Sequence, residues 1–293
     1  MLDTGTKTFF PVRNYDLAAT LGCGQAFRWT QRDSAWEGII GRRWVRLRSF
    51  QQGIEAITSE PASEWTWLTD YLQTDLDLGS VLLTFPDDEP MRAAVGHCRG
   101  LRLLRQDPWE CLASFILSST KQIVQIQQII TLLCERFGEP LSTPRGAILT
   151  RAFPTAERLA SATEAELRAC KMGFRAPSLL AAARRIAARE LDLESIRHGD
   201  VDAARAALIS LRGVGDKIAN CALLFAYGFQ QAFPIDVWVM KALRQLYFPK
   251  RRPTPRRLLN FTSTHFGPNA GYAQQYLFHY MRTRNQRNLD EQR

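Results

Sequence analysis

The chain lacks the sequence features that define several large classes of protein. Its six cysteines are scattered with no C-x-x-C pair, and its four histidines show no ligand spacing. We therefore expect reduced thiols in an intracellular protein and no catalytic metal. The N-terminal MLDTGTKTFFPVRN has no apolar signal core. The longest uncharged run, residues 218–235, is interrupted by Asn220 and Pro234, which predicts a buried helix and loop rather than a membrane span.

What the chain does contain is a core-forming fraction of apolar residues and an excess of positive charge. Hydrophobic residues make up 45% of the 293 positions, enough for one large or two modest globular domains. The net charge of +9 and the isoelectric point near 9.5 favour a polyanionic partner.

Two kinds of periodicity divide the chain. Short β-rich runs such as AFRWTQ and AWEGIIG fill much of residues 9–84, whereas helical spacing dominates from about residue 90. Asp107 and Pro108 mark a helix start, because Asp is a preferred N-cap and Pro suits the first turn. We predict an α+β fold, in which an N-terminal antiparallel sheet domain (1–95) packs on a mostly helical domain (96–293).

The most informative stretch is LISLRGVGDKIANCALLFAYGFQQAFPIDVWVM, residues 208–240. Helical spacing stops at Gly213 and Gly215 and then resumes, which predicts a helix-hairpin-helix at about residues 204–228. We expect both glycines to allow positive φ and to leave outward-facing amides that suit a phosphate oxygen. Lys217 follows the hairpin as a candidate nucleophile, and Asp236 follows Pro234 as a candidate carboxylate partner. The pattern alone fits catalysis and simple DNA binding equally well, because Lys217 can be solvated and Asp236 can serve only as an N-cap.

Four segments extend this pattern to a family resemblance. The hairpin and the loop ending in FPID resemble the helix-hairpin-helix superfamily of base-excision DNA glycosylases. The segments GQAFRW (24–29), LRLLRQDPWECLASFI (101–116) and GYAQQYLF (271–278) are similar to the 8-oxoguanine DNA glycosylase/AP lyase family, in the family's order. The clustered C-terminal cysteines of the endonuclease III branch are missing, so we expect no iron–sulfur cluster and no other cofactor.

The resemblance implies a bifunctional enzyme. Lys217, as a neutral amine, would attack C1′ of a flipped nucleotide, displace the base and form a Schiff base that allows β-elimination. Asp236 would stabilise the positive charge that develops on the sugar. Superfamily members that only remove bases generally lack this lysine.

Four residues are expected to recognise 8-oxoguanine. By resemblance, the carbonyl of Gly24 accepts a hydrogen bond from the N7–H that guanine lacks, and Gln274 reads the Watson–Crick edge. Cys221 and Phe278 would sandwich the purine. Without the resemblance, Gly24 fits a simple turn, and Cys221 and Phe278 fit ordinary core packing.

The family also implies contacts with the DNA backbone and the opposite strand. Besides Gly213 and Gly215, the backbone carbonyls of Ile209, Leu211 and Val214 would hold a monovalent cation that bridges to phosphate. This chain has Thr120-Lys121-Gln122 where the family has an asparagine run, and Gln125 where an Arg contacts the orphaned cytosine, so we expect a weaker preference for cytosine opposite the lesion. Trp238 replaces a family His that contacts the 5′-phosphate, so the resemblance does not carry over that contact. The remaining predicted DNA contacts are Thr120, Lys121, Gln125, Phe174, Arg175, Val237 and Trp238.

Two other functions remain open. One is an alkylbase glycosylase of the same fold, against which Lys217, Gly24 and Gln274 argue. The other is a helix-hairpin-helix DNA-binding protein with an inactive site. In each case the expected partner is double-stranded DNA, bound by a monomer that has no membrane contact; an active enzyme would need a damaged purine in that duplex.

Overall fold

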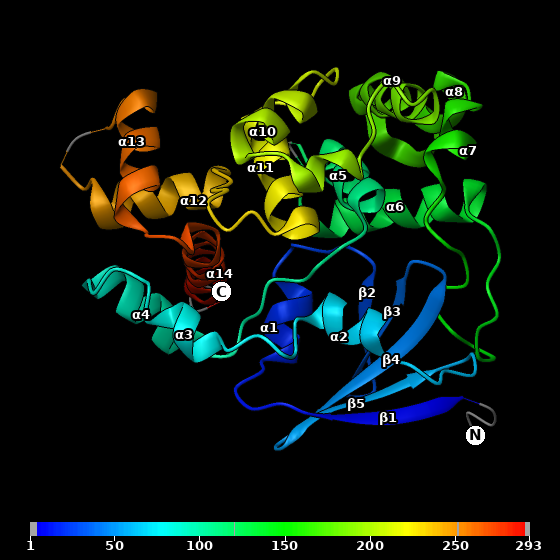
Figure 1. The fold of residues 1–293 in the computed structure, drawn as a ribbon, viewed down its shortest axis with the longest axis horizontal. Helices are drawn as coiled ribbons and strands as arrows, with labels where there is room; N and C mark the ends of the chain where they lie inside the picture. The colour runs from blue at the N-terminus through cyan, green and yellow to red at the C-terminus, as the bar shows by residue number, and fades with distance from the viewer. Residues whose placement is uncertain (1–4, 120, 251, 291–293) are drawn as a thin grey trace.

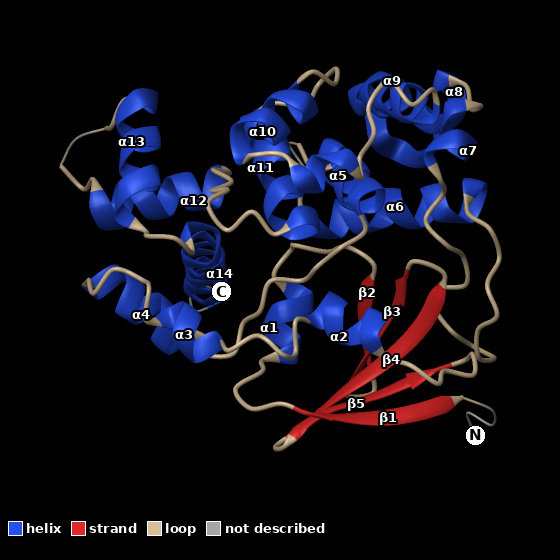
Figure 2. Cartoon of the chain, viewed as in Figure 1, coloured by secondary structure: helices blue, strands red, loops and turns tan. Residues whose placement is uncertain are grey.

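The computed structural model describes residues 5–119, 121–250 and 252–290, and it has a β-sheet at one end and helices over the rest (Figures 1 and 2). The sheet has five antiparallel strands in the order β1-β5-β4-β3-β2. This confirms the predicted α+β class. The strands are β1 Thr6–Pro11, β2 Trp29–Arg32, β3 Ala35–Ile40, β4 Arg43–Phe50 and β5 Gly53–Thr58.

The helices begin earlier in the chain than the periodicity predicts, with one short helix between β1 and β2. In order they are α1 Leu17–Gly22, α2 Thr66–Leu72, α3 Leu78–Leu82, α4 Glu89–His97, α5 Pro108–Leu117, α6 Ile123–Phe137, α7 Ala156–Ala160, α8 Glu164–Leu167, α9 Ala176–Ala187, α10 Val201–Ile209, α11 Asp216–Ala222, α12 Val237–Ala242, α13 Pro255–His265 and α14 Ala270–Asp290. Short 3-10 or π-helical turns cover Arg168–Met172, Gly173–Arg175, Ser195–His198, Leu223–Tyr227 and Leu243–Tyr247.

Two hydrophobic clusters support these layers. The smaller one lies under the sheet, where Val45 and Leu47 of β4 pack with Leu68 and Leu72 of α2. The larger one joins the helices around α5, whose Cys111, Leu112, Ala113 and Ile116 are fully buried. Burial on all sides fits the nearly unbroken apolar sequence of this helix.

The predicted start of α5 is confirmed in detail. The side chain of Asp107 accepts a hydrogen bond from the backbone N–H of Glu110 at 2.8 Å, and Pro108 occupies the first turn. This cap fixes where the central helix begins, and the helix ends one residue before Ser118, which faces the hairpin. Among the described residues, no helix combines the length and the apolar character needed to cross a bilayer.

Candidate active site

The helix-hairpin-helix forms where the sequence predicts it, from α10 through a tight turn into α11 (Figure 1). Gly213 has a φ of +80°, and a Cβ there would lie 2.4 Å from Ser178 Oγ, so the turn needs glycine. The expectation of positive φ at Gly215 is wrong. Its φ of −109° is extended because it is the N-cap of α11, where extended backbone is usual.

Lys217 lies in the first turn of α11 and points back toward the end of α5. Its Nζ donates to Ser118 Oγ at 2.8 Å and lies 5.1 Å from the ring centre of Phe115. Ser118 in turn donates to the carbonyl of Phe115 at 2.8 Å. The half-buried amine is therefore held in place by α5 rather than left free in solvent.

Asp236 is the N-cap of α12, and its Oδ1 accepts from the backbone N–H groups of Trp238 at 3.0 Å and Val239 at 2.8 Å. Burial raises the pKa of the Asp236 carboxyl above its ordinary value. The Val239 N–H and the positive charge of Lys217 oppose that rise. Lys217 donates to Ser118 rather than to Asp236, yet the two charges are close enough to interact.

Cys221 lies one helical turn after Lys217 and is 3% exposed. Burial raises the pKa of its thiol to about 12, while Lys217 lowers it and Asp236 raises it further. The charges of Lys217 and Asp236 therefore both act on this thiol. The structure thus brings three of the predicted residues, Lys217, Cys221 and Asp236, into one electrostatic cluster.

Gln274 and Phe278 lie one turn apart on α14, which packs closely on the loop before Asp236. A Cβ on Gly271 would lie 2.2 Å from Leu224 Cδ1 and 2.8 Å from the carbonyl of Ala232, so only glycine permits this approach. Gln274 is 3% exposed, and its Oε1 has no hydrogen-bond partner. A buried acceptor without a donor is unusual and is a reason to look for a ligand.

Gly24 sits in the loop between α1 and β2 with a φ of +81°. A Cβ on it would lie 2.6 Å from Ile123 Cδ1 and 3.6 Å from Arg282 Nη1. Because Arg282 belongs to α14, the loop that carries Gly24 touches the helix that carries Gln274 and Phe278. Four predicted recognition residues therefore come from α11, α14 and one loop.

The predicted DNA contacts differ in exposure. Phe174 is 60% exposed and Val237 is 78% exposed, as expected for residues that contact a ligand rather than the core. The guanidinium of Arg175 stacks on Phe174 at 4.9 Å and donates to the carbonyl of Gly213 at 3.4 Å. Trp238 is half-buried with Lys241 Nζ 5.5 Å from its ring.

The segment before α6 is only partly described. Lys121 and Gln125 are exposed, and Gln125 Oε1 accepts from the backbone N–H of Gln122 at 3.1 Å, which caps α6. Thr120 lies outside the described residues. The structure gives Gln125 a capping role that the sequence analysis missed.

The predicted cation ligands lie at the end of α10 and in the hairpin. Ile209 is the last residue of α10, where the final carbonyls of a helix have no partner within it. The carbonyl of Leu211 accepts from the N–H of Val214 at 3.1 Å. A carbonyl oxygen that already accepts one hydrogen bond keeps a second lone pair. The cation site at Ile209, Leu211 and Val214 stays a prediction.

Comparisons with known proteins decide the family. A model of the 8-oxoguanine DNA glycosylase N-terminal domain matches residues 7–112, and a model of HhH-GPD superfamily base excision DNA repair proteins matches residues 113–265. The N-glycosylase/DNA lyase OGG1 of Arabidopsis thaliana is 30% identical over 94% of this chain and 80% of that protein. The chain belongs to the 8-oxoguanine DNA glycosylase family. As such, it is a base-excision DNA glycosylase/lyase.

Solved structures agree with this family. An 8-oxoguanine glycosylase/lyase from Clostridium acetobutylicum, in complex with double-stranded DNA containing cytosine opposite to 8-oxoG, is 31% identical to the present glycosylase with a TM-score of 0.88. That match covers 97% of this chain and 99% of the other. A 3-methyladenine DNA glycosylase from Archaeoglobus fulgidus shares the fold at 20% identity, with a TM-score of 0.78 over 94% and 98% of the two chains.

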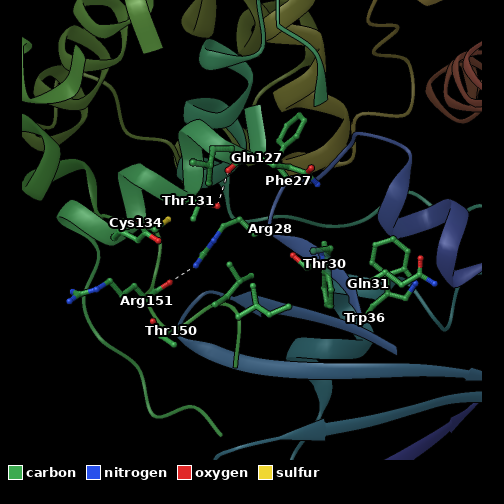
Figure 3. A pocket seen from close by; sticks show the side chains of 15 residues that line it. Phe27, Arg28, Thr30, Gln31, Trp36, Gln127, Thr131, Cys134, Thr150 and Arg151 are labelled. Atoms are coloured by element: carbon green, nitrogen blue, oxygen red, sulfur yellow. Dashed lines mark hydrogen bonds between the residues drawn. The ribbon is translucent and has the colours of Figure 1, made fainter. Parts of the chain in front are cut away.

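Two hollows of the glycosylase have different surroundings. One, of about 460 Å³, is lined by Asp236 and the surface of α12, including Val237. The other, of about 300 Å³, lies between β2, β3 and α6, and no predicted site residue lines it (Figure 3). Its Arg28 pairs with Glu110 at 3.3 Å and donates to the carbonyl of Arg151, so it joins the sheet to the helices.

Gln25, which no pattern in the sequence singles out, holds the Gly24 loop in place. This fully buried amide donates to the carbonyls of Thr20 at 2.9 Å and Arg102 at 2.8 Å, and it accepts from the N–H of Leu104 at 2.9 Å. The motif GQAFRW contains this glutamine, but only its tertiary partners show that its hydrogen bonds fix the loop of the glycosylase.

Proposed function

We propose that this enzyme removes 8-oxoguanine from duplex DNA and then cleaves the abasic strand, with Lys217 as the nucleophile and Asp236 as its electrostatic partner. The observation that supports it most is the cluster at the hairpin. The amine follows the turn directly, and its charge acts on both the Asp236 carboxyl and the Cys221 thiol. A phosphate-binding turn next to an amine and a carboxylate suits chemistry at C1′ of a flipped nucleotide.

The reaction has two stages. The neutral Lys217 amine bonds to C1′ as the bond from C1′ to N9 breaks, and the base leaves with the bonding electrons and gains a proton. The sugar ring opens to a Schiff base with Lys217, and loss of a C2′ proton expels the 3′-phosphate by β-elimination. Water then hydrolyses the Schiff base and frees the lysine.

Asp236 contributes charge and position in this proposal. Cleavage from C1′ leaves positive charge on the sugar, which a carboxylate nearby stabilises more strongly in a buried site than in water. The two backbone N–H groups that it accepts from hold the carboxylate still, so no reorganisation is needed during the reaction.

In this proposal the base is recognised by stacking on both faces of the purine and by hydrogen bonds at two of its edges. Phe278 and Cys221 would cover the two faces of the purine, Gln274 would read its Watson–Crick edge, and the Gly24 carbonyl would accept N7–H. The partnerless Oε1 of Gln274 supports this assignment, because a guanine N–H would satisfy it.

Several groups on one face of the enzyme would contact the duplex. The amides at Gly213 and Gly215 would bind phosphate, with a cation on the carbonyls of Ile209, Leu211 and Val214 adding positive charge. The exposed ring of Phe174 suits a wedge in the stack. Opposite-strand contacts from Thr120, Lys121, Gln125, Arg175, Val237 and Trp238 stay predictions.

Borohydride trapping tests the proposal. Incubating the enzyme with an 8-oxoguanine duplex and sodium borohydride should give a covalent protein–DNA adduct, and Lys217→Gln should give none. The matched control is Lys7→Gln, which removes an exposed lysine of β1, outside every predicted DNA contact. A 3-methyladenine duplex tests the alkylbase alternative, and wild-type protein that binds but neither traps nor releases any base would indicate a binding module.

A further inference from the structure

Arg282 of α14 is a half-buried cation whose hydrogen bonds are incomplete. Its Nη2 donates to the carbonyl of Gly22 at 3.1 Å, while its Nη1 is buried and has no partner. Nη1 lies 3.6 Å from the Cβ position of Gly24. A buried guanidinium N–H without an acceptor is costly, so its place beside the predicted recognition loop calls for an explanation.

Gln274, Phe278 and Arg282 follow one another at intervals of four residues, so they form one stripe along α14. The first and last are separated by about 12 Å along the helix axis. Each contributes one buried atom without a partner, an acceptor at Gln274 Oε1 and a donor at Arg282 Nη1. The aromatic ring between them supplies a stacking surface.

We infer that Arg282 is a specificity-determining residue that donates a hydrogen bond from Nη1 to O8 of the flipped base. The inference rests on the proposed function and on 8-oxoguanine as its substrate. A purine stacked on Phe278 with its Watson–Crick edge toward Gln274 turns its opposite edge, N7 and C8, toward Gly24 and Arg282. At C8 the oxidised base carries an acceptor, O8, whereas guanine carries only C–H at that atom.

The loop contacts support this orientation of Arg282. Gln275 Nε2 donates to Cys23 Sγ at 3.1 Å, and Arg282 Nη2 donates to the carbonyl of the preceding residue, Gly22, at the end of α1. α14 therefore holds the loop through Gln275 as well as through Arg282. With Nη2 on the loop, the planar guanidinium keeps Nη1 fixed for a second acceptor.

Single-turnover base release from an 8-oxoguanine duplex tests this role. Arg282→Met should slow release by about 10- to 100-fold, the loss that corresponds to one charge-assisted hydrogen bond. Arg282→Lys should recover part of the rate. Arg284→Met, which removes an exposed arginine from the same helix, should match wild type. A preformed abasic site contains no base, so the rate of its cleavage should be unchanged in all three variants.

An 8-thioguanine duplex separates contact with the base from support of the loop. This base keeps N7–H but replaces O8 with sulfur, a weaker acceptor. Wild type should release 8-oxoguanine faster than 8-thioguanine. Arg282→Met should lose most of this ratio of release rates. An equal ratio in both proteins, or an unchanged rate in Arg282→Met, overturns the inference. Failure of wild type to release 8-oxoguanine would instead overturn the proposed function.

Discussion

Asp236→Asn should separate two roles of one side chain, the cap of α12 and the buried negative charge. Asparagine is as good an N-cap as aspartate, so its Oδ1 can accept from the same N–H groups of Trp238 and Val239. It cannot carry charge. We therefore expect the variant to stay folded and to release the base much more slowly than wild type.

The sign of the stability change follows from the pKa. Burial raises the pKa of Asp236 in the folded protein, so the folded state holds this proton to higher pH than the unfolded chain does. The free energy of unfolding therefore falls as pH rises between the unfolded and folded pKa values, and above the folded value the whole penalty is present. Removing the charge at pH 7 should leave Asp236→Asn as stable as wild type or more stable.

Asp236→Ala gives the matched comparison because it removes both charge and cap. Loss of the cap costs about 1 kcal/mol, which lowers Tm by roughly 2 °C in a protein of this size. Thermal unfolding at pH 7 should rank Asp236→Asn above Asp236→Ala. Both should release 8-oxoguanine slower by on the order of 100-fold, as when one preorganised charge partner is removed. An alanine variant as stable as the asparagine variant would refute the cap, and an active asparagine variant would refute the electrostatic role.

Three further changes test the packing of α14, the Arg28–Glu110 pair and the exposed Phe174. Gly271→Ala places a Cβ against Leu224 and should lower the free energy of unfolding by about 1–3 kcal/mol in urea. Burial raises the pKa of Glu110 to about 6, although the charge of Arg28 lowers it. The contribution of Glu110 to the free energy of unfolding should therefore fall by about 2 kcal/mol as pH rises from 4 to 7. Glu110→Gln should lack that fall in a profile of unfolding free energy against pH. Phe174→Ala, at an exposed position, should keep Tm unchanged and weaken duplex opening, measured with a fluorescent base analogue opposite the lesion.

Features that depend on neighbours in sequence could be predicted from the sequence. The cap at Asp107 and the hairpin at Gly213 follow from residues within a few positions of each other, so local chemistry decides them. The exception is Gly215. Its place two residues after Gly213 suggested a second left-handed residue, but a glycine can also adopt the extended backbone that an N-cap needs.

Features that depend on tertiary partners could not be predicted in the same way. Gln25 reads as a polar strand residue until Arg102 and Leu104 supply its partners from 77 and 79 positions away. The six-residue α1 is too short to show helical periodicity, and it is fixed by its cap at Asp16 and by burial of Leu17. Contacts of this kind leave no periodic trace in the sequence.

Two buried polar atoms without partners lie on one face of α14, and that is an argument for function. Among the described residues, several buried polar atoms lack partners, but those of Gln274 and Arg282 lie on one stripe, on either side of Phe278. Asp236 adds a half-buried carboxyl with a raised pKa, and Gly24 adds left-handed backbone. Such costs persist when a ligand offsets them in the bound state. An oxidised purine with a donor and an acceptor on each edge would satisfy the open groups together.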